Sequence, residues 1–376
     1  AADTAPAGDA STPAASAPAA SAPSGDTSAS PVAGKKVAYI MQMAPSDIFQ
    51  MWSEYAEKTA VGLGMEYQAF FCNGSDTTWQ DTVSQCASGG YDGLLLSHGG
   101  QNYAYTFLTD LLKQYPDLKI ATFDTPFKDS NGETQKIEGV TQFFQQDAQF
   151  AELLLDYICN TLYPDKVAAG EPVKVLKVWV GPNFNSPFDR RQVGYEKYEQ
   201  EGLIQTVETI GPSDFNNAEA SMTDVTTATL AKYQPGDIDA IWCCYDLYAS
   251  GVYTALTQGN FDIPMVSVDI SNADIDKMAA ANSPWKACAT TNWYYNGEFG
   301  MRVLALEMAG EYDKIIDHSR DPGYGVRRRN QRDEPGYGCG RRLQRSFLDA
   351  HHRLDGRPAG GLIQNKGADL WEERLL

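Results

Sequence analysis

Arginine and histidine are scarce in most of the chain. Among residues 1–317 of the 376, the arginines are Arg190, Arg191 and Arg302, against fifteen lysines, and His98 is the only histidine. A lone histidine with no partner at ligand spacing does not predict a metal site. The formal net charge of -19 argues against nucleic acid or an anionic membrane as partner, because both are bound by positive surfaces.

The chain also lacks the motifs of common enzyme chemistries. It has no G-x-S-x-G elbow, no P-loop, no G-x-G-x-x-G after the first predicted strand and no H-E-x-x-H. It has no apolar run long enough to span a bilayer and no CxxC pair among its seven cysteines. We therefore predict buried free cysteines, with a Cys72–Cys86 disulfide as the alternative, and neither a metal nor a cofactor.

Residues 1–34 are dominated by Ala, Ser, Pro, Thr, Gly and Asp. Such a segment has little apolar surface to offset the entropy of ordering, so we expect a disordered linker. The sequence starts without Met or a signal peptide, which leads us to expect a processed, exported chain, tethered to a membrane by a lipid-bearing cysteine upstream. A plain linker at a domain terminus is the alternative.

Predicted strands and helices alternate through the middle of the chain. Short apolar runs such as "KKVAYIMQ", "YDGLLLSH" and "LKIATFD" are separated by segments with helical periodicity. A second series begins after Gly170, with "VKVLKVWVG", "IDAIWCCYD" and "IPMVSVD" among its strands. This alternation is typical of parallel sheets with crossover helices, and two series predict two α/β lobes with a cleft between them.

Polar side chains gather where these strands end, which is where open α/β sheets bind ligands. They are Asp124, Tyr245, Asp246 and Asp269, with Arg190 and Arg191 at a loop-to-helix entry. Carboxylates and a planar guanidinium bind hydroxyl groups, and aromatic rings stack on apolar C–H faces. The combination predicts a site for a small neutral polyol such as a sugar.

The segments "YDGLLLSH", "IATFDT", "RRQVGY", "IDAIWCCYD" and "PMVSVD", in this order, resemble the periplasmic sugar-binding proteins of ABC transporters, of the type I ribose- and galactose-binding kind. The resemblance covers about residues 35–316. It implies two doubly wound parallel-sheet lobes joined by a hinge, the first from 35–144 with 292–316 and the second from 145–291. It also implies a monomeric, extracytoplasmic binding protein, in the periplasm or at the cell surface. Such a protein captures a monosaccharide or related polyol and delivers it to an ABC permease.

The same resemblance implies ligand-binding roles for Phe49, Trp52, Asp124, Arg191, Tyr245, Asp269, Thr291 and Asn292. Ile48 replaces the first ring of the family's Phe-Phe pair. Thr125 stands where ribose-binding members have arginine, which argues against a pentose.

Arg191 matches the family's arginine ahead of a Gly-aromatic pair, here Gly194 and Tyr195, and we expect Arg190 to be a solvated neighbour. For Tyr245 and Trp293, packing in the core or hinge remains an equal alternative. Thr291 and Asn292 both lie within alignment error of the family's hinge Gln or Asn.

Two other function classes fit the composition less well. An α/β enzyme acting on a carbohydrate would use Asp124 and Asp269 as paired carboxylates, although in this fold type they act as hydroxyl acceptors. The ligand-sensing domain of a transcription regulator would need a basic helix-turn-helix in front, where this chain has its Ala/Ser/Pro linker.

Residues 317–376 differ from the rest of the chain. From His318 onward they hold eleven of the fourteen arginines and show no alternation of strand and helix. We interpret this atypical Arg/Gly-rich tail as the product of a shifted reading frame, which would leave the second lobe without its closing strand. A basic tail that binds an acidic surface polymer is the alternative.

Overall fold

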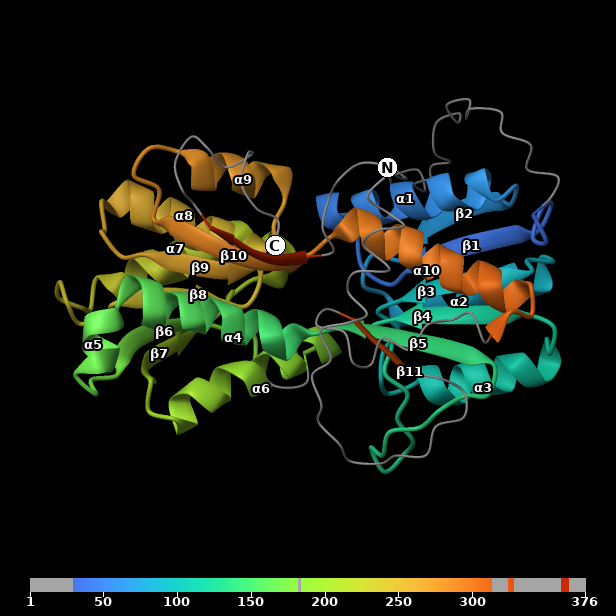
Figure 1. Cartoon of the computed structure of the whole chain (residues 1–376), viewed down its shortest axis with the longest axis horizontal. Helices are drawn as coiled ribbons and strands as arrows, with labels where there is room; N and C mark the ends of the chain where they lie inside the picture. Colours follow the sequence, from blue (N-terminus) through green and yellow to red (C-terminus); the bar gives the residue numbers. More distant parts are fainter. Residues whose placement is uncertain (1–29, 182–183, 313–323, 328–359, 365–376) are drawn as a thin grey trace, which may run out of the picture.

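A computed structural model describes residues 30–181, 184–312, 324–327 and 360–364. These residues form two lobes that lie side by side, each built on a twisted sheet with helices on both faces (Figure 1). The predicted α/β architecture with two parallel sheets is confirmed. Residues 1–29, which belong to the predicted linker, lie outside the described part of the chain.

The first sheet has the order β11-β5-β4-β3-β1-β2. Its parallel strands are β1 (Lys36–Met41), β2 (Glu66–Phe71), β3 (Gly93–Ser97), β4 (Lys119–Phe123) and β5 (Val140–Gln145). Alternate residues of β1 point to opposite faces, so Tyr39 joins the apolar cluster under one helical layer and Ile40 joins the cluster under the other. Burial on both faces explains why the central strands β1, β3 and β4 are almost continuously apolar.

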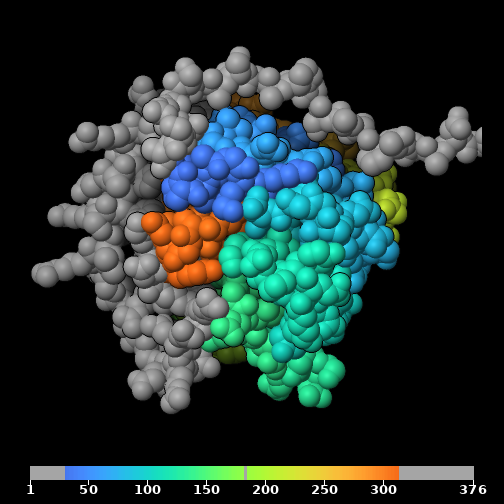
Figure 2. Space-filling model, turned by 90° about the vertical axis from the view of Figure 1, so that its right-hand side faces the viewer, coloured from blue at the N-terminus to red at the C-terminus, as the bar shows by residue number. Residues whose placement is uncertain are grey.

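Helices α1 (Asp47–Gly62), α2 (Asp76–Ser88), α3 (Ala104–Gln114) and α10 (Trp293–Met308) belong to this lobe. Although α10 is distant in sequence, it packs on α1, β3 and β4. Figure 2 faces this lobe and shows the orange α10 residues beside the blue residues of the N-terminal part. A Cβ at Gly297 would lie 2.1 Å from the carbonyl oxygen of Trp52, so only glycine permits this close approach of α10 to α1.

The second sheet has the order β12-β10-β9-β8-β6-β7. Its parallel strands are β6 (Val173–Val178), β7 (Ile204–Ile210), β8 (Ala240–Cys243), β9 (Met265–Val268) and β10 (Trp285–Thr291). The helical segments of this lobe are α4 (Asp147–Tyr157), η2 (Ile158–Leu162), α5 (Pro164–Ala168), α6 (Ser186–Gln200), η3 (Phe215–Asn217), α7 (Ala218–Leu230), α8 (Asp246–Gly259) and α9 (Asn272–Ala279). The chain passes into this lobe after β5 and returns to the first lobe after β10 (Figure 1).

Two short strands from the atypical tail pair antiparallel at the sheet edges. The strand β11 (Tyr324–Arg327) pairs with β5, and β12 (Gly360–Gln364) pairs with β10. The expectation that the second sheet lacks its closing strand is therefore wrong for the chain as it stands. The shifted reading frame itself stays a hypothesis, and the remainder of the tail lies outside the described residues.

The described cysteines are all free and buried. Cys72 and Cys86 lie in the core of the first lobe, so the alternative of a disulfide between them is wrong and burial as free thiols is confirmed.

Candidate functional site

Three residues that directly follow strands have left-handed backbones. They are His98 after β3 (φ 57°), Asp124 after β4 (φ 45°) and Asp269 after β9 (φ 67°). Each backbone N–H donates to a carbonyl oxygen of the neighbouring strand. The backbone nitrogen of Asp124, for example, lies 3.1 Å from the carbonyl oxygen of Phe143. Left-handed conformations are uncommon for residues other than glycine and concentrate at functional sites. The carboxyl ends of β3, β4 and β9 are therefore the candidate site.

Two arginines enter the site from the first turns of α6. The side chain of Asn185 caps this helix by accepting from the N–H of Phe188 at 3.2 Å, and Pro187 occupies its first turn. Gly194 lets α6 cross α4 closely, because a Cβ there would lie 2.1 Å from the carbonyl oxygen of Ala148. This crossing places Arg190 and Arg191 beside the start of α4.

Asp147, the first residue of α4, holds both arginines. Its Oδ1 accepts from Arg191 Nε at 2.9 Å, and its Oδ2 accepts from Arg190 Nε at 3.0 Å. Arg190 also donates from Nη2 to Asp124 of the first lobe, so this guanidinium joins the two lobes. The prediction that Arg190 is a solvated neighbour is wrong, because its side chain is only 29 % exposed and pairs with two fully buried carboxylates.

Arg191 lies deeper, with a side chain that is 3 % exposed. It donates from Nη2 to Asp269 Oδ2 at 3.0 Å and from Nη1 to the carbonyl oxygen of Cys244 at 2.6 Å. Although burial acts to lower it, Asp269 and Asp147 raise the pKa of Arg191 above its usual value. The cost of a cation at a helix N-terminus is offset here by these buried carboxylates.

The pKa values of Asp124 and Asp269 are shifted toward neutral pH. Burial raises the pKa of Asp124 to about 7, against the opposing charge of Arg190 and with the help of the nearby Asp147. Burial raises the pKa of Asp269 to about 6, and here Arg191 opposes the shift. Asp124 Oδ2 and Asp269 Oδ1 are buried and have no hydrogen-bond partner among the described residues. Each is an acceptor ready for a donor from a ligand.

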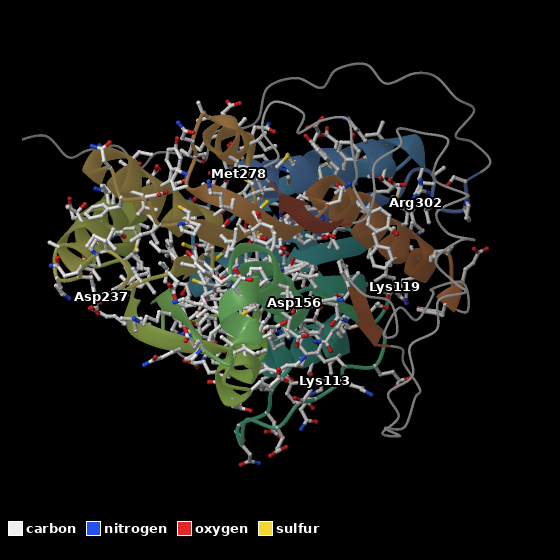
Figure 3. All side chains as sticks on the ribbon, turned by 60° about the vertical axis from the view of Figure 1, so that its left-hand side comes forward. Lys113, Lys119, Asp156, Asp237, Met278 and Arg302 are labelled. Atoms are coloured by element: carbon white, nitrogen blue, oxygen red, sulfur yellow. The ribbon has the colours of Figure 1, made fainter. Side chains whose placement is uncertain are left out.

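A cavity of about 320 Å³ opens between the lobes beside this network. The first lobe contributes the loops after β1, β3 and β4, and the second lobe contributes the segment that leads into α6. Its lining residues are Gln42, Met43, Asp76, His98, Gly99, Gly100, Gln101, Asn102, Asp124, Pro126, Phe184, Asn185, Ser186 and Pro187. Charged residues such as Asp237 and Arg302 lie instead at the outer surface of the molecule (Figure 3).

The structure thus brings Asp124, Arg191 and Asp269 of the predicted site together. Phe49 contacts the strand end after β3, with its ring 5.3 Å from the ring of His98. Trp52 has no exposed surface and packs in the core of the first lobe, 4.6 Å from the ring of Phe123 and 5.1 Å from that of Tyr39.

The other predicted residues lie where the two lobes meet. Tyr245 is half-buried, contacts the apolar clusters of both lobes, and lies 6.0 Å from the ring of Phe188. Thr291 donates to Asn296 Oδ1 at 3.2 Å, and Asn292 caps α10 by accepting from the N–H of Tyr295 at 3.2 Å. These contacts place Thr291 and Asn292 at the crossing from β10 to α10.

Sequence reasoning missed Asp147 and His98 and misjudged Arg190. Asp147 was not predicted because it begins a helix, whereas the candidate residues follow predicted strands. His98 is the last residue of the predicted strand "YDGLLLSH", so it could have been identified as a polar residue at a strand end. Within the described ranges no cluster of His, Cys, Asp or Glu is arranged to hold a metal ion, and no helix there is long and apolar enough to cross a membrane.

Neither a family model nor a curated protein matches this sequence. Solved structures do match, among them a sugar ABC transporter protein from Yersinia enterocolitica subsp. enterocolitica 8081, with 30 % identity, a TM-score of 0.64, and coverage of 78 % of this chain and 83 % of that one. A 5-methylthioribose transporter solute-binding protein from Thermotoga lettingae, in complex with 5-methylthioribose, matches with 20 % identity and a TM-score of 0.63 over 73 % of this chain and 81 % of that one. An ABC transporter solute-binding protein from Agrobacterium vitis with bound allitol matches with 18 % identity and a TM-score of 0.59 over 74 % and 91 % of the two chains. The last two show the fold alone.

Proposed function

Because this chain belongs to the sugar-binding proteins of ABC transporters, we propose that it captures a monosaccharide or related polyol between its lobes and delivers it to a membrane permease. It is a binding protein and not an enzyme. Its place of action is extracytoplasmic, where this family collects ligand.

One observation carries the choice of ligand class. Asp124 Oδ2 in the first lobe and Asp269 Oδ1 in the second are buried acceptors with no partner among the described residues. Sugar hydroxyl groups are donors that can reach both when the lobes close. A wrong epimer would leave one acceptor unpaired, which costs about 1–3 kcal/mol and gives the site its selectivity.

The charges of the site favour a neutral ligand. Every guanidinium nitrogen of Arg190 and Arg191 already donates, to Asp124, Asp147, Asp269, Ser186 or the carbonyl oxygen of Cys244. The two guanidinium groups are already balanced by the buried carboxyl groups of Asp124, Asp147 and Asp269, so an anionic sugar would bring a further negative charge close to these carboxyl groups. We therefore infer that sugar phosphates and sugar acids are excluded.

Closure of the lobes is the event that couples capture to delivery. Arg190 joins Asp124 of one lobe to Asp147 of the other, so the contact exists only when the lobes are together. A ligand that bridges the same lobes stabilises this closed arrangement, which the permease recognises.

The aromatic residues at the site suit the apolar face of a sugar ring. We assign this role to Tyr245, which packs against the apolar clusters of both lobes, and to Phe49, whose ring contacts that of the cavity-lining His98. Roles for Trp52, Thr291 and Asn292 as ligand contacts stay predictions, since these three pack or bond within the protein.

We further infer that the N-terminal linker tethers the protein to a membrane through an upstream lipid anchor, and that it acts as a monomer. The composition of residues 1–29 supports the tether, because a segment rich in Ala, Ser and Pro has little apolar surface to pack against the lobes. Membrane fractionation of cells that express the whole gene, with and without a detergent wash, tests the anchor. Light scattering of the purified chain tests the monomer.

A thermal-shift screen tests the proposed function. The panel contains D-allose, D-arabinose, allitol, 5-methylthioribose, common hexoses, their phosphates, nucleosides and amino acids. A ligand that binds only the folded state raises the Tm in proportion to ln(1 + [L]/Kd). A shift with a neutral sugar supports the proposal, whereas a shift only with amino acids, nucleosides or sugar phosphates contradicts it.

A further inference from the structure

A second cavity lies next to the candidate site. It has a volume of about 360 Å³ and is lined by residues of both lobes. The first lobe contributes residues after β3 and β4 and part of β5, and the second lobe contributes the first half of α6. None of the residues predicted to contact the sugar lines this second cavity. It is therefore additional to the sugar site described above.

The two cavities adjoin each other. Gln101, Pro126 and Ser186 line both of them. The guanidinium of Arg190 lies between the two. It donates to Asp124 in the lining of the first cavity, and its Cζ lies 5.2 Å from the centroid of the Phe144 ring in the lining of the second. A ligand that is larger than one sugar ring can therefore extend from the first cavity into the second.

Apolar side chains form much of the wall of the second cavity. They are Pro126, Phe127, Phe144 and Val193. Val193 is 64 % exposed, which makes it the most exposed large apolar side chain in the described part of the chain. Apolar and aromatic side chains are what small-molecule sites use to cover the apolar part of a ligand.

The polar groups closest to the first cavity already have partners within the protein. Every guanidinium nitrogen of Arg190 donates to Asp124, Asp147 or Ser186. The amide nitrogen of Gln142 donates to the carbonyl oxygen of Thr125 at 2.8 Å. The flat face of the guanidinium and the aromatic rings remain as the binding surfaces on this side.

We propose that the second cavity is a subsite for an aromatic aglycone, so that the preferred ligand is an aryl glycoside with its sugar ring in the first cavity. This inference rests on the proposed function and extends it from the sugar to the group attached to the sugar. Aromatic rings pack favourably on one another and on a guanidinium plane. The glycosidic bond lies where Gln101, Pro126 and Ser186 border both cavities.

The test compares ligands that share one sugar and differ only in what is attached to it. The sugar is the neutral one that gives the largest shift in the thermal screen. Calorimetry measures the affinity of the whole chain for this free sugar, for its methyl and phenyl glycosides in both anomeric forms, and for a disaccharide that contains it. The variant is Val193→Ser, which removes apolar surface from the second cavity without adding charge or bulk. The matched control is Val61→Ser, at an exposed valine of α1 that lines neither cavity.

We expect one anomer of the phenyl glycoside to bind the wild type at least about tenfold more tightly than the matching methyl glycoside does. Val193→Ser should reduce this gain by at least about threefold and leave the affinity for the free sugar unchanged, whereas Val61→Ser should match the wild type for every ligand.

Equal affinity for the phenyl and methyl glycosides, or a gain that Val193→Ser does not reduce, overturns the subsite and leaves the proposed function intact. A gain with the disaccharide and none with the phenyl glycoside overturns the aromatic class of the aglycone. A wild-type chain that binds neither the free neutral sugars nor their glycosides overturns the proposed function as well.

Discussion

The guanidinium of Arg190 in the second lobe donates a hydrogen bond to the carboxylate of Asp124 in the first. The same side chain also donates to Asp147 at the start of α4. One residue thus connects the end of a strand in one lobe with the start of a helix in the other. Arg190 therefore links the two lobes directly through Asp124, which also lines the cavity between them.

Replacing Arg190 by Gln should shift the ligand-free chain toward an open arrangement of the lobes, because the charge that joins Asp124 to Asp147 is lost. The measurement is small-angle scattering, and the expected result is a larger radius of gyration that falls when sugar is added. The control is Arg302→Gln, since Arg302 pairs with Glu298 on the outer surface of α10 (Figure 3). Identical scattering from Arg190→Gln and wild type would show that this pair does not hold the lobes together.

Replacing Asp124 by Ala should weaken sugar binding by roughly 10- to 100-fold, because a hydrogen bond to a charged group contributes about 1.5–3 kcal/mol. Calorimetric titration measures the loss. The control is Asp237→Ala, an exposed aspartate at the far end of the second lobe (Figure 3), which should bind as the wild type does. Equal affinity of both variants would remove Asp124 from the site.

Replacing Arg191 by Met should destabilise the fold by about 3–5 kcal/mol, because it leaves the buried carboxylate of Asp269 without its partner and removes one of the two arginines that pair with Asp147. Urea unfolding at pH 7 measures the change in free energy. Arg302→Met removes an ion pair whose arginine is 46 % exposed and should cost less than about 1 kcal/mol. If both variants unfold alike, the network at Arg191 is not a major source of stability.

The stability of the chain should depend on His98 below pH 6.5. Burial, together with the charges of Arg190 and Arg191, lowers its pKa from 6.5 to about 3 on folding, so in this window the unfolded chain binds the proton and the folded chain does not. Stability is therefore lost as pH falls from 6.5 toward 3, by at most about 1.4 kcal/mol per pH unit. The pKa values of Asp124 and Asp269 rise to about 7 and 6, so these groups act in the opposite direction and favour the fold at lower pH.

The variant His98→Asn isolates the contribution of the histidine. Its free energy of unfolding, measured by urea titration from pH 8 to 4, should fall less steeply with acid than that of the wild type. Parallel curves for the two proteins would mean that His98 takes up a proton equally well in the folded chain.

Gly194→Ala should disturb the site from a distance. The added Cβ would lie 2.1 Å from the carbonyl oxygen of Ala148, so α6 must move away from α4 and carry its arginines with it. We expect a loss of about 1–3 kcal/mol in stability and a weaker affinity for sugar. Gly62→Ala places a Cβ where nothing lies within 4 Å and should be tolerated. Urea unfolding measures the stability of both variants, and calorimetric titration measures their affinity for sugar. If Gly194→Ala keeps the stability and affinity of the wild type, the helices can separate without moving the site.

The sequence by itself determined the fold class and two carboxylates of the candidate site, those of Asp124 and Asp269. Apolar runs such as those of β3 and β4 alternate with helical periodicity, and this pattern depends only on which faces must be buried. Asp124 and Asp269 were predictable for the same reason, since polar residues that directly end buried strands must reach the edge of the sheet. Polar residues interrupt "VTQFFQ", so local sequence does not predict β5, and pairing with β4 makes this segment a strand.

Only the tertiary structure decided which charges meet. Arg190 and Arg191 are neighbours on one helix, yet one reaches across to the first lobe while the other turns inward to Asp269. Asp147 joins the network because Gly194 lets α6 approach α4. His98 faces the cavity because its strand lies beside β4. Distances between side chains on separate elements depend on how whole helices and sheets pack, and local sequence patterns do not encode those distances.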